Sequence, residues 1–372
     1  MDLDFSEEQL MLRDTVARLC TDYHGSDAIR ALERDELGYS GGFWQAMADM
    51  GLCGLTMGEP HGGQGLGCLE AVLVHEQMGR CLAPSPHLAS CLVAAHLLEV
   101  AGTPEQQQHW LGTIASGETI AIPAWHEVNG SADLSRCTTR IRSMEGRWIL
   151  DGEKVLVPFA NSADVFLVPA LDEAGVLQLA LVPAGQVQLR VQPNHADQTL
   201  YAVAFDAVEL PAEAMLQSGE LSGQWDEVML RGLICVAAQA VGGASRMLEM
   251  ANDYASERDQ FGQPIGAFQA IAHYLADRAT ELEGARYLVY QAAWACDRGE
   301  PWAQLALMAK LQGTAVFRRT TVTGVQVHGG MGFSSEADPQ LYYRRAKHLQ
   351  LMDWDPRYLE QRIADEVFAL SL

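Results

Sequence analysis

The segment RDQFGQPIGAFQ, residues 258–269, separates two long stretches of helical periodicity. Its Phe-Gly pair and the Gln-Pro-Ile-Gly run that follows are typical of a bend between helices. Such a bend leaves a guanidinium, an aromatic ring and an amide projecting from the chain. A guanidinium suits a phosphate, whereas a ring and an amide suit the face and the edge of an adenine. The residues alone are equally consistent with a helix corner that buries Phe261 and leaves Arg258 in solvent.

The regions on either side of this bend differ in periodicity. Helical patterns fill the first third, short Val-, Leu- and Ile-rich runs follow from about Thr119 to Gln217, and helical patterns return from Trp225. We therefore predict an α+β multidomain fold. The predicted domains are an N-terminal helical domain over 1–118, a middle antiparallel β domain over 119–220, and a C-terminal four-helix bundle over 221–372.

Turn and cap residues predict where the elements begin and end. The Asp-Gly pair at 151–152 predicts a turn between strands, and the Gly-Gly pair at 329–330 predicts a helix end. Pro339 and Pro356 each predict the first turn of a short helix. The predicted helices include 5–22, 43–50, 69–79, 87–101, 104–115 and 228–257, and the predicted strands are 147–150, 154–157, 165–168, 177–182, 187–191 and 202–208.

Composition and charge limit the partners and the compartment. With 372 residues, 48% hydrophobic, the chain is an ordinary globular protein. The acidic start MDLDFSEEQL is unlike a signal peptide, and no apolar run approaches the ~20 residues of a membrane span. The formal net charge of −23 argues against nucleic acid and anionic membranes. The eight cysteines show no metal-ligand spacing, so we expect reduced thiols in a cytoplasmic protein.

The bend and its flanks resemble the signature segment of acyl-CoA dehydrogenases, flavoproteins that desaturate acyl-CoA thioesters. The matching residues are Tyr254, Arg258, Phe261, Gly262, Pro264, Ile265 and Gln269. The order helical, β, helical is also that of the family, so the resemblance covers the whole chain. In the family the matching Arg, Phe and Gln grip the FAD of a neighbouring subunit. The resemblance thus implies FAD as cofactor, with Arg258, Phe261 and Gln269 among its ligands.

A second segment, QVHGGMGF at 326–333, resembles the family's Gln-x-x-Gly-Gly-x-Gly. In the family its glutamine and backbone approach the FAD pyrophosphate and adenine across the dimer. Glycine permits this approach because a Cβ would hold the phosphates away. The resemblance implies that Gln326, Gly329 and Gly330 contact FAD, and a helix C-cap at the two glycines is compatible with that role.

A third segment, YRRAKHLQLMDWD at 343–355, resembles the one that carries the family's catalytic glutamate. That glutamate removes the α-proton of the thioester while a hydride leaves the β-carbon for flavin N5. The match places Asp353, one methylene shorter, at this position. A carboxylate in an apolar cleft is a competent base because its pKa rises there. A second family branch carries its base at the position of Gly232, which has no side chain. A helix cap shared with Asp355 is the other interpretation of Asp353.

The β domain departs from the family pattern at the flavin end of the site. The family's Thr-Glu-Pro-x-Ala-Gly-Ser-Asp becomes WHEVNGSADL at 125–134, which keeps Ser131 in a shifted position as a candidate cofactor ligand. The family's Lys-x-Trp-Ile-Thr-Asn becomes KVLVPFA at 154–160, where Leu156 replaces the Trp and Pro158 replaces the Thr. Proline has no hydroxyl and no backbone donor, so the flavin loses partners here.

These departures lead to one main hypothesis and two alternatives. Because the adenine-end residues serve a neighbour's cofactor, a chain can keep them while losing its own flavin pocket. Heteromeric acyl-CoA dehydrogenases of bacterial steroid and sterol side-chain breakdown are built this way, and Leu-Ala-Pro at 82–84 resembles that group. We predict a subunit of a homo- or heteromeric dimer of dimers that desaturates a bulky acyl-CoA and passes electrons to an electron-transfer flavoprotein. The alternatives are a non-catalytic subunit that completes a partner's FAD site, and a nitroalkane-oxidising flavoenzyme with an aspartate base.

Overall fold

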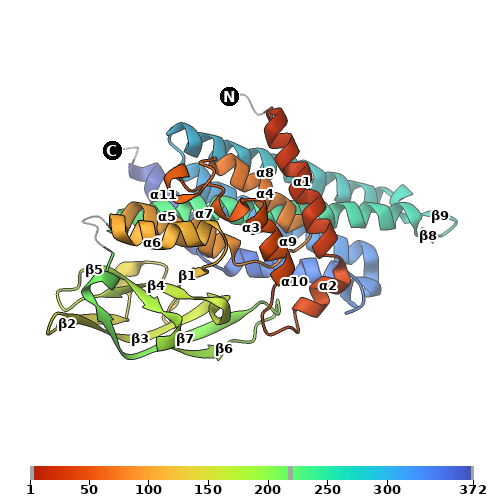
Figure 1. The fold of residues 1–372 in the computed structure, drawn as a ribbon. Coiled ribbons are helices and arrows are strands. Elements are labelled where there is room, and N and C mark those ends of the chain that lie inside the picture. Colours follow the sequence, from red (N-terminus) through yellow and green to blue (C-terminus); the bar gives the residue numbers. More distant parts are fainter. Residues whose placement is uncertain (1–3, 217–220, 370–372) are drawn as a thin grey trace. The chain divides into compact units, whose positions relative to one another are not determined.

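The computed structural model of the protein describes residues 4–216 and 221–369. Helices form the first and last parts of the chain, and a seven-stranded sheet forms the middle part (Figure 1). The predicted α+β fold is thereby confirmed. By its contacts the chain forms two compact units. The helical unit contains the described parts of 1–30, 67–83 and 233–372, and the mixed unit contains those of 31–66 and 84–232. The predicted domain boundaries stay a prediction.

The helical unit is built on close contacts between long helices. Its helices are α1 (Glu7–Tyr23), α4 (Cys68–Arg80), most of α7 (Leu221–Glu257), α8 (Gln269–Arg298), α9 (Ala303–His328), α10 (Pro339–Leu351) and α11 (Pro356–Ala369). Helices α4 and α7 pack with their backbones in contact, because a Cβ on Gly79 would collide with the carbonyl of Gln239. A Cβ on Gly242 would likewise collide with the carbonyl of Glu76. By length and composition α7 could span a membrane, but 89% of its most apolar window is buried inside the protein.

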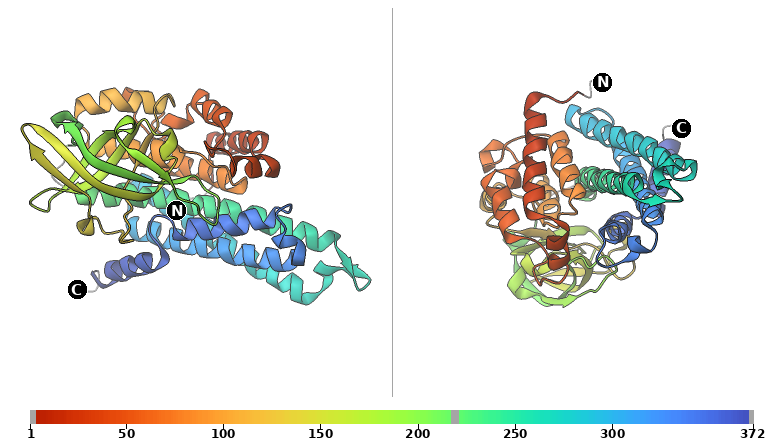
Figure 2. Two further views of the ribbon diagram at one scale, coloured as in Figure 1. Left: turned by 90° about the horizontal axis from the view of Figure 1, so that it is seen from below. Right: turned by 90° about the vertical axis from the view of Figure 1, so that its right-hand side faces the viewer.

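The bend at 258–269 is the tip of a long hairpin formed by α7 and α8. Strands β8 (Asp259–Gln260) and β9 (Gln263–Pro264) pair at this tip, which projects beyond the other helices of the unit (Figures 1 and 2). Along α8 the buried residues begin only at Leu282. The half of α8 nearest the tip is therefore largely uncovered.

The mixed unit combines helices with the sheet. Its helical elements include α3 (Gly41–Asp49), a π-helix (Leu88–Ala94), α5 (Ala95–Ala101) and α6 (Pro104–Ala115). Its strands are β1 (Ala121–Pro123), β2 (Arg140–Met144), β3 (Arg147–Pro158), β4 (Val165–Leu171), β5 (Leu177–Pro183), β6 (Gln188–Val191) and β7 (Leu200–Pro211). The strand order is β1-β4-β2-β3-β7-β6, with β5 paired to β4. Most pairs are antiparallel, whereas β1 and β2 each run parallel to β4.

The predicted turn at Asp151 and Gly152 is wrong, because β3 runs through both residues. The pairing of β3 with β7 shifts register there, between Leu150 and Gly152. Gly152 takes φ 148°, and the Asp151 carboxylate accepts the backbone N–H of Ala207 at 2.9 Å. A β-bulge thus uses the residue types that also favour turns. The predictions also lack β1, β2 and the short α2 (Ser26–Leu32).

Candidate active site

Three predicted FAD contacts of the helical unit line one cavity. Gln326, Gly329 and Gly330 surround a volume of about 290 Å³ at the end of α9. The other lining residues are Val322, Val325, Phe333 and Tyr343. Helix α9 ends at His328, as predicted, and Gly329 follows with φ 60° and ψ −139°. A Cβ on either glycine would meet no atom within 4 Å among the described residues, so both backbones are accessible from the cavity side.

An aromatic stack joins this segment to the hairpin. The rings of Tyr254 on α7 and His328 on α9 are stacked, with centroids 4.4 Å apart and an interplanar angle of 26°. The Nδ1 of His328 lies 2.7 Å from the carbonyl oxygen of Gly324, which can only accept, so Nδ1 carries the proton. The packing role expected of His328 therefore also holds the first two motif segments together.

The hairpin tip presents its candidate ligands to solvent. The Phe261 side chain is 93% exposed, with a left-handed φ of 56°. Arg258 and Gln269 are exposed too. The backbone is fixed beneath them, since Ile265 donates its N–H to the carbonyl of Arg258 at 2.8 Å. A corner that buries Phe261 is therefore wrong, and the tip carries an aromatic ring, a cation and an amide on its surface.

Asp353 lies in the turn between α10 and α11. It is half-buried and left-handed, with φ 60°, while the next residue, Trp354, is fully buried. The cap of α11 belongs to Asp355, whose carboxylate accepts the N–H groups of Arg357 at 2.7 Å and Tyr358 at 3.3 Å. Asp355 can therefore cap α11 without help from Asp353, whose role as a base stays a prediction.

A lysine that the sequence did not single out supports this turn. Lys310 on α9 is fully buried, and its Nζ donates to the carbonyl oxygens of Gln350, Met352 and Trp354 at 3.2, 3.0 and 2.7 Å. Burial lowers the pKa of Lys310 to about 8, although the carboxylates of Asp353 and Asp355 oppose this shift. The one sequence signal for this role is a lysine within the apolar run LALMAKL.

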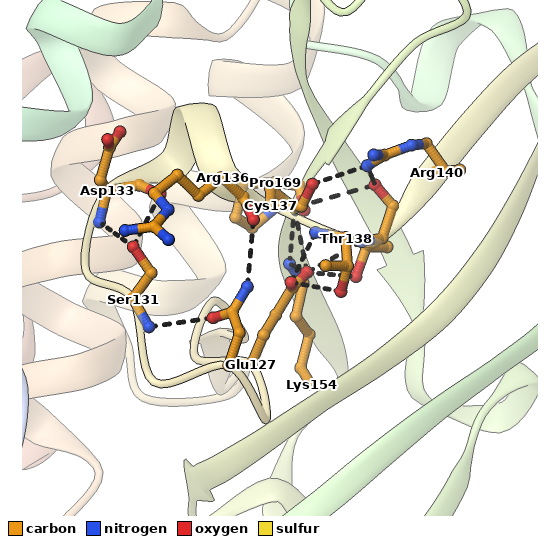
Figure 3. Close-up of polar contacts among 11 residues, drawn as sticks. Glu127, Ser131, Asp133, Arg136, Cys137, Thr138, Arg140, Lys154 and Pro169 are labelled. Carbon is orange, nitrogen blue, oxygen red and sulfur yellow. Dashed lines mark hydrogen bonds and ion pairs between the residues drawn. The ribbon is translucent and has the colours of Figure 1, made fainter.

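In the mixed unit, Ser131 belongs to a tight polar loop (Figure 3). Its N–H donates to the side-chain oxygen of Asn129 at 2.9 Å, and its hydroxyl oxygen accepts the N–H of Asp133 at 3.2 Å. These bonds fix the loop that corresponds to the family's flavin-contacting segment. The role of Ser131 as a cofactor ligand stays a prediction.

The position of the family's Trp is a second bulge in β3. The register with β7 shifts between Lys154 and Val157, and Leu156 takes φ 55°. Its N–H donates to the side-chain oxygen of Gln192 at 2.6 Å. Pro158, two residues on, pairs with Leu200 of β7. The departure is therefore a well-built local structure in which a protein group already takes the Leu156 amide.

A buried ion pair ties this strand to the Ser131 loop (Figure 3). Lys154 Nζ lies 2.8 Å from Glu127 Oε1 and 3.2 Å from the sulfur of Cys137. Thr138 and Thr139 each donate a backbone N–H and a hydroxyl to the same carboxylate. Burial alone would raise the pKa of Glu127, but Lys154 and the hydrogen bonds outweigh it and hold this pKa well below its usual value. Burial raises the pKa of Cys137.

The chain belongs to the acyl-CoA dehydrogenase family. The family model for "Acyl-CoA dehydrogenase, N-terminal domain" matches residues 6–118, and that for "Acyl-CoA dehydrogenase, C-terminal domain" matches residues 227–364. Together the two matches cover more than half of the 372 residues. The predicted family and the enzyme class, an oxidoreductase, are confirmed.

Proteins similar to this chain share its whole length. The probable acyl-CoA dehydrogenase YngJ of Bacillus subtilis is 28% identical, over 94% of this chain and 95% of YngJ. A chain in the ChsE4-ChsE5 complex from Mycobacterium tuberculosis is 26% identical, with a TM-score of 0.90 and 99% of each chain covered. A chain from a variant of the Tcur3481-Tcur3483 steroid acyl-CoA dehydrogenase is 27% identical, with a TM-score of 0.88, over 98% of this chain and 99% of the other.

FAD is the cofactor of this family, and the helical unit has groups that fit its adenine end. The cavity at Gly329 and Gly330 admits a ligand close to the backbone, and Gln326 supplies an amide beside it. At the hairpin tip, Phe261 supplies a ring face and Arg258 a fixed cation. The mixed unit fits the flavin end less well, because Leu156 and Pro158 supply neither a large aromatic ring nor a hydroxyl.

Proposed function

We propose that this protein is the subunit of an acyl-CoA dehydrogenase that desaturates the α,β bond of an acyl-CoA thioester with Asp353 as its base. The observation that carries the proposal is the placement of Asp353 at a fixed left-handed turn of the unit that also holds the candidate FAD contacts. Bound FAD would supply the hydride acceptor for the β-carbon. Asp353 would take the α-proton onto a carboxylate oxygen.

The shorter side chain of Asp353 is the main demand on this mechanism. A base that is misplaced by ~1 Å can lose on the order of a hundredfold in rate, so the backbone must bring the carboxylate forward. The left-handed φ of 60° gives the backbone at Asp353 a course that a right-handed residue would not follow. A fixed turn of this kind is what a shortened base requires.

We further propose that the chain works beside a second subunit, either another copy or a homologous chain. Its candidate adenine contacts lie on an exposed tip, and the neighbouring half of α8 leaves Tyr274 54% exposed and Tyr287 53% exposed. A groove of about 710 Å³ between α7 and α8 lies along the same surface. Exposed apolar surface of this extent is typical of an interface. The similarity to chains of the ChsE4-ChsE5 complex supports a heteromeric partner.

A bulky acyl group is the substrate class that fits these comparisons best. The Tcur3481-Tcur3483 protein is a steroid acyl-CoA dehydrogenase, and this chain is similar to it over nearly its whole length. A cytoplasmic enzyme of steroid or fatty-acid catabolism that delivers electrons to an electron-transfer flavoprotein would account for the family, the acidic charge and the fold. The net charge of −23 also supports the absence of nucleic acid and anionic membrane as partners.

The base is tested by Asp353→Asn, which keeps the shape of the side chain and removes its charge. In the holoenzyme we expect kcat to fall by about 10²- to 10⁴-fold, the usual contribution of a general base. Asp365→Asn is the matched control, because Asp365 lies on the neighbouring helix α11 and its carboxylate bonds the side chain of Gln361 on the same helix. Full turnover of the Asp353→Asn complex would instead favour the non-catalytic subunit.

The partner is tested by the visible absorbance of the chain purified alone and after co-expression with its operon neighbours. A colourless chain that gains flavin only with a partner supports the heteromeric enzyme. About one flavin per chain without a partner would favour a homomeric enzyme. Oxygen consumption and nitrite release with a nitroalkane, in the absence of acyl-CoA turnover, would favour the nitroalkane-oxidising alternative.

A further inference from the structure

We propose that Lys310 is a positioning residue that holds Asp353 in the geometry required for proton abstraction. This inference rests on the proposed function of Asp353 as the base. Lys310 does not need to touch the substrate, since it acts through the backbone on both sides of Asp353. Its ammonium would set where the carboxylate points, and the rate of the chemical step would depend on it.

The hydrogen bonds of Lys310 enclose the base in the sequence. A lysine ammonium has three N–H donors, and here they reach the carbonyl oxygens of Gln350, Met352 and Trp354 at 3.2, 3.0 and 2.7 Å. Met352 and Trp354 are the two neighbours of Asp353 in the chain. The carbonyl oxygens at the end of a helix have no partner within that helix, so α10 gives them to α9 through this one side chain. The peptide units on either side of Asp353 are thus attached to a rigid helix.

The backbone of Asp353 needs such support. Its φ of 60° is a left-handed conformation that an L-residue adopts at a cost, and it persists where the surroundings enforce it. The enforcing contacts include the buried ring of Trp354, which is fully covered. They also include Lys310, which is itself fully buried on α9 and therefore cannot move aside into solvent.

Charge supports the same assignment. Asp353 and Asp355 are the charged groups that act on the ammonium, and both favour its protonated form. On α10, the ammonium of Lys347 bonds the side chain of Gln350 at 3.1 Å instead of the turn's carbonyl groups. On α11, the guanidinium of Arg362 lies over the ring of Trp354 at 4.9 Å. With a pKa lowered to about 8 by burial, Lys310 would lose one of its three N–H donors within an accessible pH range.

The test uses Lys310→Met in the holoenzyme, with whichever subunit co-purifies, and the acyl-CoA that the wild type oxidises fastest among butanoyl-CoA, 3-phenylpropanoyl-CoA and a steroid side-chain acyl-CoA. We expect kcat to fall by about ten- to a hundredfold, as for a base misplaced by ~1 Å, with KM changed by less than about threefold. The wild-type kcat should also fall above pH ~8, and this alkaline limb should be absent in Lys310→Met.

Two control variants separate positioning from general damage. Thr314→Val alters a buried side chain one turn further along α9 whose hydroxyl bonds carbonyl groups of its own helix. Lys347→Met removes a positive charge near the turn without removing a bond to its carbonyl groups. Both should keep kcat within about twofold of the wild type, because neither touches the three bonds.

The outcomes separate the two proposals. If Asp353→Asn is inactive while Lys310→Met keeps more than a third of kcat, the base stands and the positioning role is overturned. Equal loss of kcat in Lys310→Met and the two controls would also overturn it. If Asp353→Asn keeps full turnover, both proposals fall. Should Lys310→Met not fold, Lys310→Arg decides, because its guanidinium stays charged: an alkaline limb near pH 8 that persists in Lys310→Arg overturns the proposal.

Discussion

The buried pair of Glu127 and Lys154 gives the sharpest stability prediction. Lys154 is fully buried, the Glu127 side chain is 4% exposed, and their charged atoms lie 2.8 Å apart. Lys154→Met would leave the carboxylate buried without its cation. Breaking a buried pair by removing one partner costs about 3–5 kcal/mol. The hydrogen bonds from Thr138 and Thr139 still hold the carboxylate, so we expect a loss near the lower end, about 3 kcal/mol.

Urea denaturation of the full chain, followed by far-UV circular dichroism and tryptophan fluorescence, measures this loss. Midpoints are compared at equal m-value, because a chain of two units need not unfold in one step. Arg147→Met is the matched control, since it breaks the pair with Glu209 on the same strand, where both side chains are at least 60% exposed. It should cost less than about 1 kcal/mol. A loss below about 1 kcal/mol for Lys154→Met would refute the reasoning.

The paired glycines, a buried histidine and the acid limb of stability each give a further test. Gly329→Ala should lower both FAD retention and stability, the latter by about 1–3 kcal/mol because its φ and ψ are nearly restricted to glycine, whereas Gly330→Ala should lower FAD retention alone; flavin absorbance and thermal melts distinguish them, and unchanged FAD retention in both would contradict the proposed contact. Burial lowers the pKa of His87 to about 4, so stability should fall as pH drops from about 6.5 towards 4, and His87→Gln should flatten that part of the profile. The pKa of Glu127 is held below its unfolded value, so its contribution is present above pH ~4.3 and lost at lower pH, and Lys154→Met should unfold in acid at a higher pH than the wild type.

Much of the fold could be predicted because its signals are local. The predicted helices at 69–79 and 104–115 are α4 and α6 to within a residue, since glycine, proline and caps mark their ends. The cysteines are reduced, as predicted, with Cys81 half-buried and the others buried. The π-helix Leu88–Ala94 could not be predicted because its apolar spacing is also that of an α-helix. Strand β1 could not be predicted because three residues carry no periodicity.

The site was less predictable, because its supporting groups act across long separations in sequence. Gln326, Gly329 and Gly330 form one segment, and the structure brings them to one cavity. Lys310 lies more than forty residues from Trp354, which its ammonium contacts. Nothing local distinguishes it from a lysine whose ammonium reaches solvent. The partnership of Glu127 with Lys154 depends on strand register in the same way.

The kept and the altered features of the family fall in different units, and this division has a chemical consequence. Arg258, Phe261 and Gln326 would act on the affinity for the adenine half of FAD, whereas Asp353 would act on the substrate. Loss of the former changes flavin content, and loss of Asp353 changes turnover at constant flavin content. The altered residues of the mixed unit, Leu156 among them, would weaken only the flavin half. A chain with this division can therefore contribute to binding and to chemistry in unequal measure, and flavin content and turnover must be measured separately to assign its role.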